Sequence, residues 1–265
     1  MSVDLKKLCD DVCQLAKQTG SFIRSERQNF SVSRIEVKGK NDFVSYVDKT
    51  SEIQLIKGLS ELLPDSGFIA EEGTTSKKGE VYNWIIDPLD GTTNFIHGIP
   101  CYAISIALMR NNEPVLGVIY EINLDECFYT WEGSKAYLNG IEISVSKTAS
   151  LDDALLATGF PYYDYSRLGE YMELFNYFLK NTHGLRRLGS AATDLAYVAC
   201  GRFDGFYEYC LQPWDVAAGA FIVQQAGGKV ADFKGENNYI FGREIVAGNS
   251  NSFDEFLNVV KTHFK

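Results

Sequence analysis

The sequence predicts a layered α+β protein built as two halves without a flexible linker. Apolar residues recur at helical spacing near the N-terminus, a block of β-rich runs occupies the middle, and helices alternate with short strands afterwards. No internal repeat, low-complexity stretch or Pro/Ser-rich linker interrupts these 265 residues. We therefore expect a single unit over 1–265, with an N-terminal half near 1–145 and a C-terminal half near 146–265.

The first half begins with an amphipathic pattern. Leu8, Val12 and Ile23 belong to one apolar helical face, which predicts a helix over 3–28. The elements expected after it are an alternating extended run at 35–37, a polar turn at 38–42, a helix from about Thr50 to Leu63, and strands at 67–70 and 81–86.

The middle of the chain reads as an antiparallel meander, with strands at 103–109, 115–120 and 127–131 separated by polar turns. The second half then alternates between strands and helices. We expect strands at 155–158, 206–208, 229–232 and 244–247, and helices at 165–180, 191–200, 215–226 and from Phe253 onward.

Composition excludes several classes of protein. A net charge of −10 disfavours broad affinity for nucleic acid or an anionic membrane. No secretory signal is visible and no run reaches the roughly 18 apolar residues of a membrane span. The six cysteines lack paired C-x-x-C spacing, so we expect structural free thiols rather than disulfides or zinc ligands. These observations favour a cytoplasmic protein with neither a direct nucleic-acid partner nor a membrane partner.

The segment Asp87–Phe95 carries the strongest chemical signal. Asp87 and Asp90 follow an apolar run that reads as a buried strand, and we expect Pro88 to end it. Gly91 and the threonines after it predict the start of a helix, where free N–H groups can face an anion. A divalent cation and a phosphate at one turn suggest phosphoryl chemistry.

Three further acidic positions accompany predicted strand or helix ends. Asp48 and Asp215, taken alone, would each be a helix N-cap more often than a ligand, and Glu71-Glu72 would usually be a solvated pair. Asp87 and Asp90 provide a specific centre that these residues can join.

Four segments resemble those of the inositol monophosphatase family. Asp87–Gly98 is similar to the first family signature and Trp214–Gly219 to the second, while Asp42–Asp48 and Ala70–Gly73 match two other family segments in the proper order. The resemblance runs from about Val37 to Ala231. It implies the layered αβαβα sandwich shared with fructose-1,6-bisphosphatase, together with a magnesium-dependent, lithium-sensitive phosphomonoesterase activity.

The resemblance also implies a metal site with two or three Mg²⁺ ions. Glu71, Asp87 and the Leu89 carbonyl would hold the first ion, and Asp87 would bridge to a second that Asp90 and Asp215 complete. A third, weaker ion would lie near Glu71. These oxygen donors suit Mg²⁺ and disfavour zinc.

The remaining roles follow from the same resemblance. Water activated by bound metal would attack the phosphorus, with Thr92 and Asp48 orienting and deprotonating it, and Glu71 completing the catalytic set. The N–H groups of Gly91 and Thr92 would bind the phosphate, and Gly91 would leave room for its oxygen. The substrate alcohol would contact Ser190, Ala191 and Glu208, although the spacer 209–213 departs from the commoner family type.

The sequence allows several substrates and more than one role. A small phosphorylated polyol, above all myo-inositol 1-phosphate, fits Thr93–Gly98 best. Relatives of this fold also hydrolyse 3′-phosphoadenosine 5′-phosphate, fructose 1,6-bisphosphate or NADP, and some bacterial relatives associate with transcription machinery as regulators. His97 is either a structural hydrogen-bonding residue or, less often in such loops, a catalytic acid. The family forms homodimers, and the aromatic residues of 160–177 suit helix packing and a dimer face better than base stacking.

Overall fold

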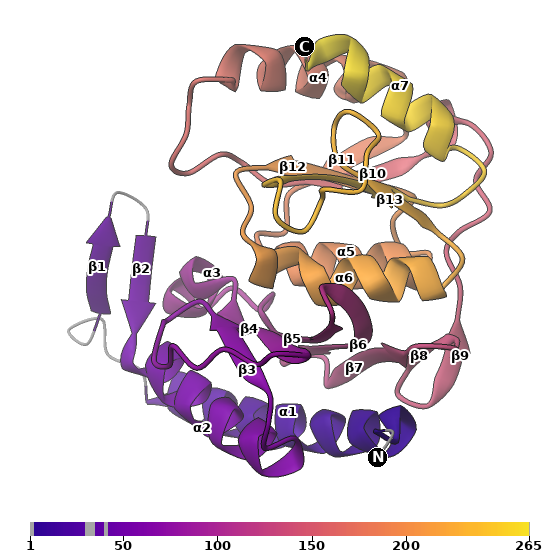
Figure 1. The fold of residues 1–265 in the computed structure, drawn as a ribbon. Helices are drawn as coiled ribbons and strands as arrows, with labels where there is room; N and C mark the ends of the chain where they lie inside the picture. The colour runs from indigo at the N-terminus through magenta and orange to yellow at the C-terminus, as the bar shows by residue number, and fades with distance from the viewer. Residues whose placement is uncertain (1–2, 30–34, 40–41, 265) are drawn as a thin grey trace.

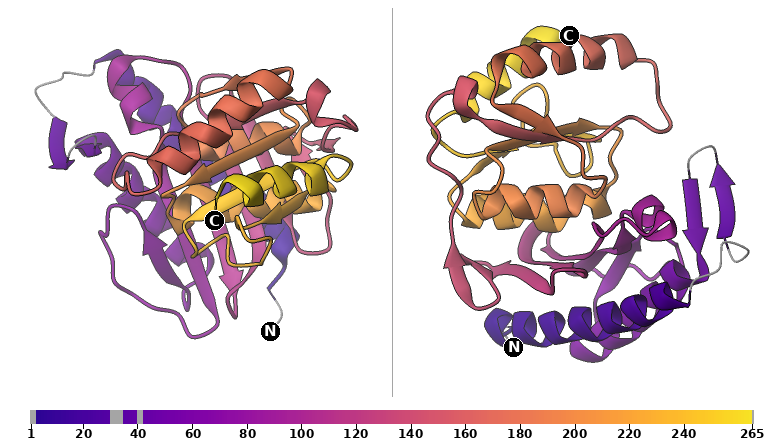
Figure 2. Two further views of the ribbon diagram at one scale, coloured as in Figure 1. Left: turned by 90° about the horizontal axis from the view of Figure 1, so that it is seen from above. Right: turned by 180° about the vertical axis from the view of Figure 1, so that it is seen from behind.

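The computed structural model describes residues 3–29, 35–39 and 42–264. Its helices and sheets are stacked in five layers (Figure 1). Helices α1 (Leu5–Gln28) and α2 (Tyr46–Leu62) cover one face of a seven-stranded sheet, and α5 (Ala191–Ala199) and α6 (Pro213–Gln225) cover the other (Figure 1). A five-stranded sheet lies beyond α5 and α6, and α4 (Leu168–Asn181) and α7 (Phe253–His263) lie side by side on its outer face (Figure 2). The predicted αβαβα sandwich is therefore confirmed.

The seven-stranded sheet has the order β3-β4-β5-β6-β7-β8-β9 and is antiparallel except where β3 runs parallel to β4. The predicted meander is present, and β8 and β9 extend it beyond the expected strands. The strands are β3 (Gly67–Ala70), β4 (Tyr82–Asp90), β5 (Ala103–Arg110), β6 (Glu113–Glu121), β7 (Glu126–Trp131), β8 (Ala136–Leu138) and β9 (Ile141–Ile143).

Pro88 does not end its strand, so that expectation was wrong. The register between β4 and β5 shifts between Asp87 and Asp90, and β4 resumes pairing at Asp90 opposite Ala103. A bulge accommodates a proline because the extra residues need not donate to the ladder. It also re-aims the side chains on either side of it, which are Asp87 and Asp90.

The five-stranded sheet has the order β11-β10-β12-β14-β13. The pairs β10–β11 and β10–β12 are parallel, whereas β14 is antiparallel to both of its neighbours. The strands are β10 (Leu155–Thr158), β11 (Gly184–Arg186), β12 (Gly205–Tyr209), β13 (Lys229–Ala231) and β14 (Glu244–Gly248). A 3₁₀ turn at Leu151–Asp153 precedes β10, and the short helix α3 (Thr92–His97) follows β4.

One apolar core joins the two sheets through α5 and α6. Ile85 of β4, Leu195 of α5 and Phe206 of β12 all belong to this buried cluster. Gly219 lets the two helices pack closely, since a Cβ there would lie 2.5 Å from the Leu195 Cβ. The continuous core holds the N-terminal ends of α5 and α6 against the end of β4.

Some boundaries differ from the prediction. Helix α2 begins at Tyr46 rather than near Thr50, which places Asp48 in its first turn. Strands β1 (Ile35–Gly39) and β2 (Asp42–Ser45) form a hairpin beside the sandwich (Figure 1), and residues 40–41 of the predicted polar turn lie outside the described residues. All six cysteines are free thiols, as predicted. None of the helices in the described ranges is long and apolar enough to cross a membrane.

Candidate active site

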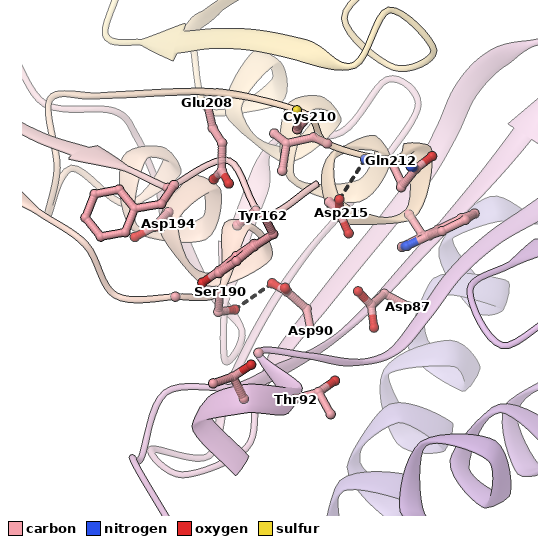
Figure 3. Close-up of a pocket in the computed structure, with 18 of the residues that line it drawn as sticks. Asp87, Asp90, Thr92, Tyr162, Ser190, Asp194, Glu208, Cys210, Gln212 and Asp215 are labelled. Carbon is pink, nitrogen blue, oxygen red and sulfur yellow. Dashed lines mark hydrogen bonds between the residues drawn. The ribbon is translucent and has the colours of Figure 1, made fainter. Parts of the chain in front are cut away.

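Three carboxylates meet where the two halves join. Asp87 and Asp90 come from the end of β4 and Asp215 from the first turn of α6, and their ligand atoms lie within 4.8 Å of one another (Figure 3). The chain brings these predicted ligands together from segments more than a hundred residues apart in the sequence.

Each carboxylate is oriented by a hydrogen bond to one of its oxygens. The Leu89 N–H donates to Asp87 Oδ1 over 2.9 Å, and the Gln212 N–H donates to Asp215 Oδ2 over 2.7 Å. The bond from Gln212 is part of the capping box at the start of α6, so Asp215 both caps its helix and belongs to the cluster. Each of these bonds engages only one of the two carboxylate oxygens. The other oxygen of Asp87 and of Asp215 therefore remains able to bind a cation.

Asp90 is held from the opposite half of the protein. Its Oδ2 accepts from the Ser190 hydroxyl at 2.6 Å and from the Ala192 N–H at 2.7 Å, both at the N-terminal end of α5. Ser190, predicted to line the substrate pocket, is only 1% exposed, and its hydroxyl is also 2.8 Å from Thr193 Oγ1. In this structure Ser190 therefore orients Asp90.

Glu71 reaches the cluster from the end of β3. Its backbone N–H donates to the Ile86 carbonyl at 3.2 Å, which keeps it beside β4. The side-chain Oε2 of Glu71 is buried and has no hydrogen-bond partner. A buried carboxylate oxygen without a donor calls for a cation or water.

Burial and mutual repulsion raise the pKa of every carboxyl in this group. The pKa values of Glu71 and Asp87 are raised well above the ordinary range, first by burial and then by neighbouring carboxylates. Burial also raises the pKa of Asp90 to about 6 and that of Asp215 to about 8. This concentration of acidic oxygen donors fits a hard divalent cation such as Mg²⁺, which would offset the repulsion.

Thr92 stands beside the cluster with two acceptors for its single proton. Its hydroxyl lies 3.0 Å from Asp48 Oδ1 and 3.0 Å from the Leu89 carbonyl oxygen. Asp48 is fully buried in the first turn of α2. With its proton engaged, the Thr92 oxygen can accept a hydrogen bond from a molecule in the pocket.

The backbone conformation at residue 91 requires a glycine. It adopts φ +92°, and a Cβ there would come within 3.0 Å of the Cys101 carbonyl oxygen and 3.2 Å of that of Gly189. Gly91 thus allows the turn that links Asp90 to Thr92.

The pocket continues from the cluster toward the second half of the protein. Ser190, Ala191 and Glu208, the three predicted substrate contacts, line it, whereas His97 is exposed and is not among the lining residues. Sequence reasoning missed several other lining residues: Phe160, Tyr162, Tyr163, Arg187, Asp194 and Cys210. The sequence did mark two of these regions, the aromatic run of 160–177 and the spacer 209–213 that contains Cys210, but it assigned neither to the site. Arg187 stands two residues before Gly189-Ser190, which was the signal for it.

Comparison with known proteins decides the family. The profile described as "Inositol monophosphatase family" matches residues 4–263. The chain belongs to the inositol monophosphatase family. Among its relatives, the Inositol-1-monophosphatase of Mesorhizobium japonicum is 41% identical over 255 residues, and the match covers 96% of each chain.

Other relatives in the family carry a different name. The Putative Nus factor SuhB of Neisseria meningitidis serogroup B is 42% identical over 249 residues, covering 94% of this chain and 95% of its own. Among solved structures, an IMPase of Thermotoga maritima superposes with a TM-score of 0.87 at 35% identity, covering 96% of both chains.

Proposed function

We propose that this family member is a Mg²⁺-dependent phosphomonoesterase that hydrolyses myo-inositol 1-phosphate or a related polyol phosphate. The observation that supports it most is the meeting of Asp87, Asp90 and Asp215 within 4.8 Å. Thr92, on the turn that follows Asp90, is hydrogen-bonded to Asp48, so an acid–base pair stands next to an oxygen-donor site. This is the combination that metal-assisted phosphate ester hydrolysis needs.

The ligands divide between two ions in this proposal. Glu71, Asp87 and the Leu89 carbonyl would hold one, and Asp87, Asp90 and Asp215 the other, with a third, weaker ion near Glu71. When bound, Mg²⁺ supplies Lewis acidity and neutralises negative charge on the phosphate. The hydrogen bonds to Asp87 and Asp215 support a role for both as ligands, since each carboxylate keeps one oxygen free of the bonds described above.

The protein's own residues would orient the reactants. Thr92 would accept a hydrogen bond from the attacking water and pass its own proton toward Asp48, which is 3.0 Å away. The N–H groups of Gly91 and Thr92 would hold the phosphate. Ser190, Ala191 and Glu208 would contact the alcohol, because all three line the pocket beyond Asp90.

A panel of phosphomonoesters assayed by phosphate release tests this proposal. The panel contains myo-inositol 1-phosphate, fructose 1,6-bisphosphate, 3′-phosphoadenosine 5′-phosphate and NADP, with Mg²⁺ titrated and Li⁺ added. We expect Mg²⁺-dependent release that is fastest from inositol 1-phosphate and is inhibited by Li⁺. Preference for the adenosine bisphosphate would replace the polyol as substrate.

The relatives named Nus factor favour a second candidate role. These relatives, named Nus factor SuhB, stand at 40–42% identity, and the second candidate role is to bind a partner on the same scaffold. The intact set of acidic residues supports turnover but is compatible with both roles. A flat, low response across the whole ester panel would favour the binding role over hydrolysis.

We also propose that the protein forms a homodimer through the 160–172 surface. Five large apolar side chains there are exposed: Phe160, Tyr163, Tyr165, Leu168 and Met172. Grouped exposed apolar residues of this kind mark contact surfaces. Light scattering should give twice the monomer mass, and Met172→Lys should shift it toward the monomer; a monomeric wild type would overturn the proposal.

A further inference from the structure

Asp194 is a buried carboxylate that no part of the proposed chemistry uses. It lies in the first turn of α5, is 1% exposed, and lines the pocket together with Glu208. Its Oδ1 is buried without a hydrogen-bond partner. It does not cap its helix, because the Ser190 hydroxyl accepts from the Thr193 N–H in that role.

Asp194 and Glu208 lie on the side of the pocket away from Asp87 (Figure 3). Glu208 comes from β12, where Gly159 makes room for it, since a Cβ on Gly159 would lie 2.0 Å from the Glu208 carboxyl oxygens. Glu208 is only 8% exposed. Two acidic groups from different elements therefore face the end of the pocket that would hold the alcohol.

Arg187 supplies positive charge beside both carboxylates. It lowers the pKa of Asp194 and of Glu208, although burial and other carboxylates keep both raised. Within the described residues, Arg187 forms no ion pair with either of them. Its guanidinium instead packs against Phe160 and Tyr162, at 5.1 and 5.2 Å from the ring centroids.

This cluster leaves both an acceptor and a donor unpaired, because Arg187 Nε, like Asp194 Oδ1, is buried without a hydrogen-bond partner. A buried carboxylate oxygen without a donor is costly, and proteins keep such groups mainly at functional sites. The group that fits is a hydroxyl, because it can donate to Asp194 and accept from Arg187, whereas an ammonium group can only donate. A leaving alcohol with hydroxyls at two positions can satisfy Asp194 and Glu208 together.

We propose that Asp194 is a specificity residue that accepts a hydrogen bond from a second hydroxyl of the alcohol, beside the one that contacts Glu208. The preferred substrates are then phosphate esters of neutral polyols with hydroxyls on two sides, rather than of simple alcohols or amino alcohols. This inference rests on the proposed phosphomonoesterase function and assigns its substrate class to a residue that the sequence did not single out.

Substrate discrimination by Asp194 variants tests the inference. We compare kcat/KM for inositol 1-phosphate, phosphoethanolamine and p-nitrophenyl phosphate, an ester whose alcohol has no further donor. Asp194→Asn and Asp194→Leu should lower kcat/KM for inositol 1-phosphate by about ten- to a hundredfold, the loss expected when a buried polar group is left without its hydrogen-bond partner. Hydrolysis of p-nitrophenyl phosphate should change less than about twofold, because no bond to Asp194 is lost.

Controls separate this role from a structural one. Asp152→Asn alters an exposed carboxylate and should leave all three esters unchanged. Asp194→Leu should also raise the thermal midpoint, because it removes a buried carboxylate oxygen that lacks a partner. A variant that folds but fails to hydrolyse every ester would show that Asp194 supports the cluster instead.

Three other outcomes would overturn the inference. An unchanged ratio between inositol 1-phosphate and p-nitrophenyl phosphate in Asp194→Asn would remove Asp194 from substrate recognition. A wild-type preference for phosphoethanolamine would make the site one for ammonium. Failure of the wild type to hydrolyse any ester with Mg²⁺ would instead refute the underlying enzyme assignment, which the p-nitrophenyl phosphate arm detects by itself.

Discussion

The Thr92 hydroxyl lies 3.0 Å from Asp48 Oδ1, joining the first turn of α3 to the first turn of α2. Its other acceptor, the Leu89 carbonyl, belongs to the bulge of β4. Three elements thus fix one hydroxyl next to the carboxylate cluster. The geometry directs the Thr92 proton toward these acceptors and leaves the Thr92 oxygen able to accept a hydrogen bond from another molecule.

Removing this hydroxyl should slow the reaction without weakening metal binding. We expect Thr92→Val to lower kcat by about a hundredfold or more, in the range of general acid–base contributions, while the Mg²⁺ half-saturation stays within about twofold. Steady-state kinetics with titrated Mg²⁺ checks this. Thr92→Ser is the matched control and should keep most of the activity; equal losses in both variants would contradict a role for the hydroxyl.

Ser190 should affect stability and metal binding together. Ser190→Ala removes the cap of α5 and one donor to Asp90, so we expect a loss of about 1 kcal/mol in the free energy of unfolding and a higher Mg²⁺ requirement. Urea denaturation and a Mg²⁺ titration of activity measure the two effects. Ser252→Ala is the control, because Ser252 is the N-cap residue of α7 and its side chain makes no capping hydrogen bond. An unchanged Mg²⁺ requirement would separate Ser190 from the cluster.

Glu52 fixes the loop that carries Glu71. It is fully buried in α2 and accepts from the Glu72 N–H at 2.7 Å, the Thr74 N–H at 2.8 Å and the Thr74 hydroxyl at 2.7 Å. Glu52→Gln places an amide against one of these donors and should cost about 1 to 3 kcal/mol of stability. It should also weaken Mg²⁺ binding by calorimetry, whereas the exposed Glu61→Gln in the same helix should do neither. Normal Mg²⁺ affinity would limit Glu52 to folding.

The stabilisation by Mg²⁺ should grow with pH. Folding raises the pKa of Asp90 to about 6 and of Asp215 to about 8, above their values in the unfolded chain, so their contribution favours folding at low pH and is lost as pH rises through these values. Mg²⁺ binds the deprotonated forms and offsets their repulsion. The thermal midpoint should therefore rise more on adding Mg²⁺ at about pH 8 than at about pH 6.

Two results would contradict this account of the cluster. One is a Mg²⁺ effect that is the same at both pH values. The other is an undiminished effect in Asp215→Asn, which removes one of the three clustered carboxylates.

Regular patterns made most of the fold predictable. The amphipathic face of α1 and the apolar strands of the meander follow directly from residue spacing, and the buried Leu8, Val12 and Ile23 are those that the pattern indicates. Pro88 misled the prediction because a bulge, which depends on pairing with β5, removes the need for its N–H. The short β8 and β9 carry too few residues for a periodic signal.

The candidate site, like the fold, could be predicted only in part. Asp87 and Asp90 share one turn, so their proximity follows from local sequence, and the family resemblance brought in Glu71 and Asp215. Ser190 and Asp194 depend on how α5 meets the end of β4, which no local pattern reports. The bond between Ser190 and Asp90 spans 100 positions in the chain, and only the packing of the two sheets on α5 and α6 creates it.

Phosphate release from myo-inositol 1-phosphate by the Asp90→Asn protein tests the central claim most directly. Asp90 lies in the three-carboxylate cluster, and the substitution removes its charge with little change in shape. We predict that, at saturating Mg²⁺, kcat/KM falls by about a hundredfold or more, while the exposed Asp65→Asn matches the wild type. Hydrolysis by folded Asp90→Asn at the wild-type rate would contradict the account.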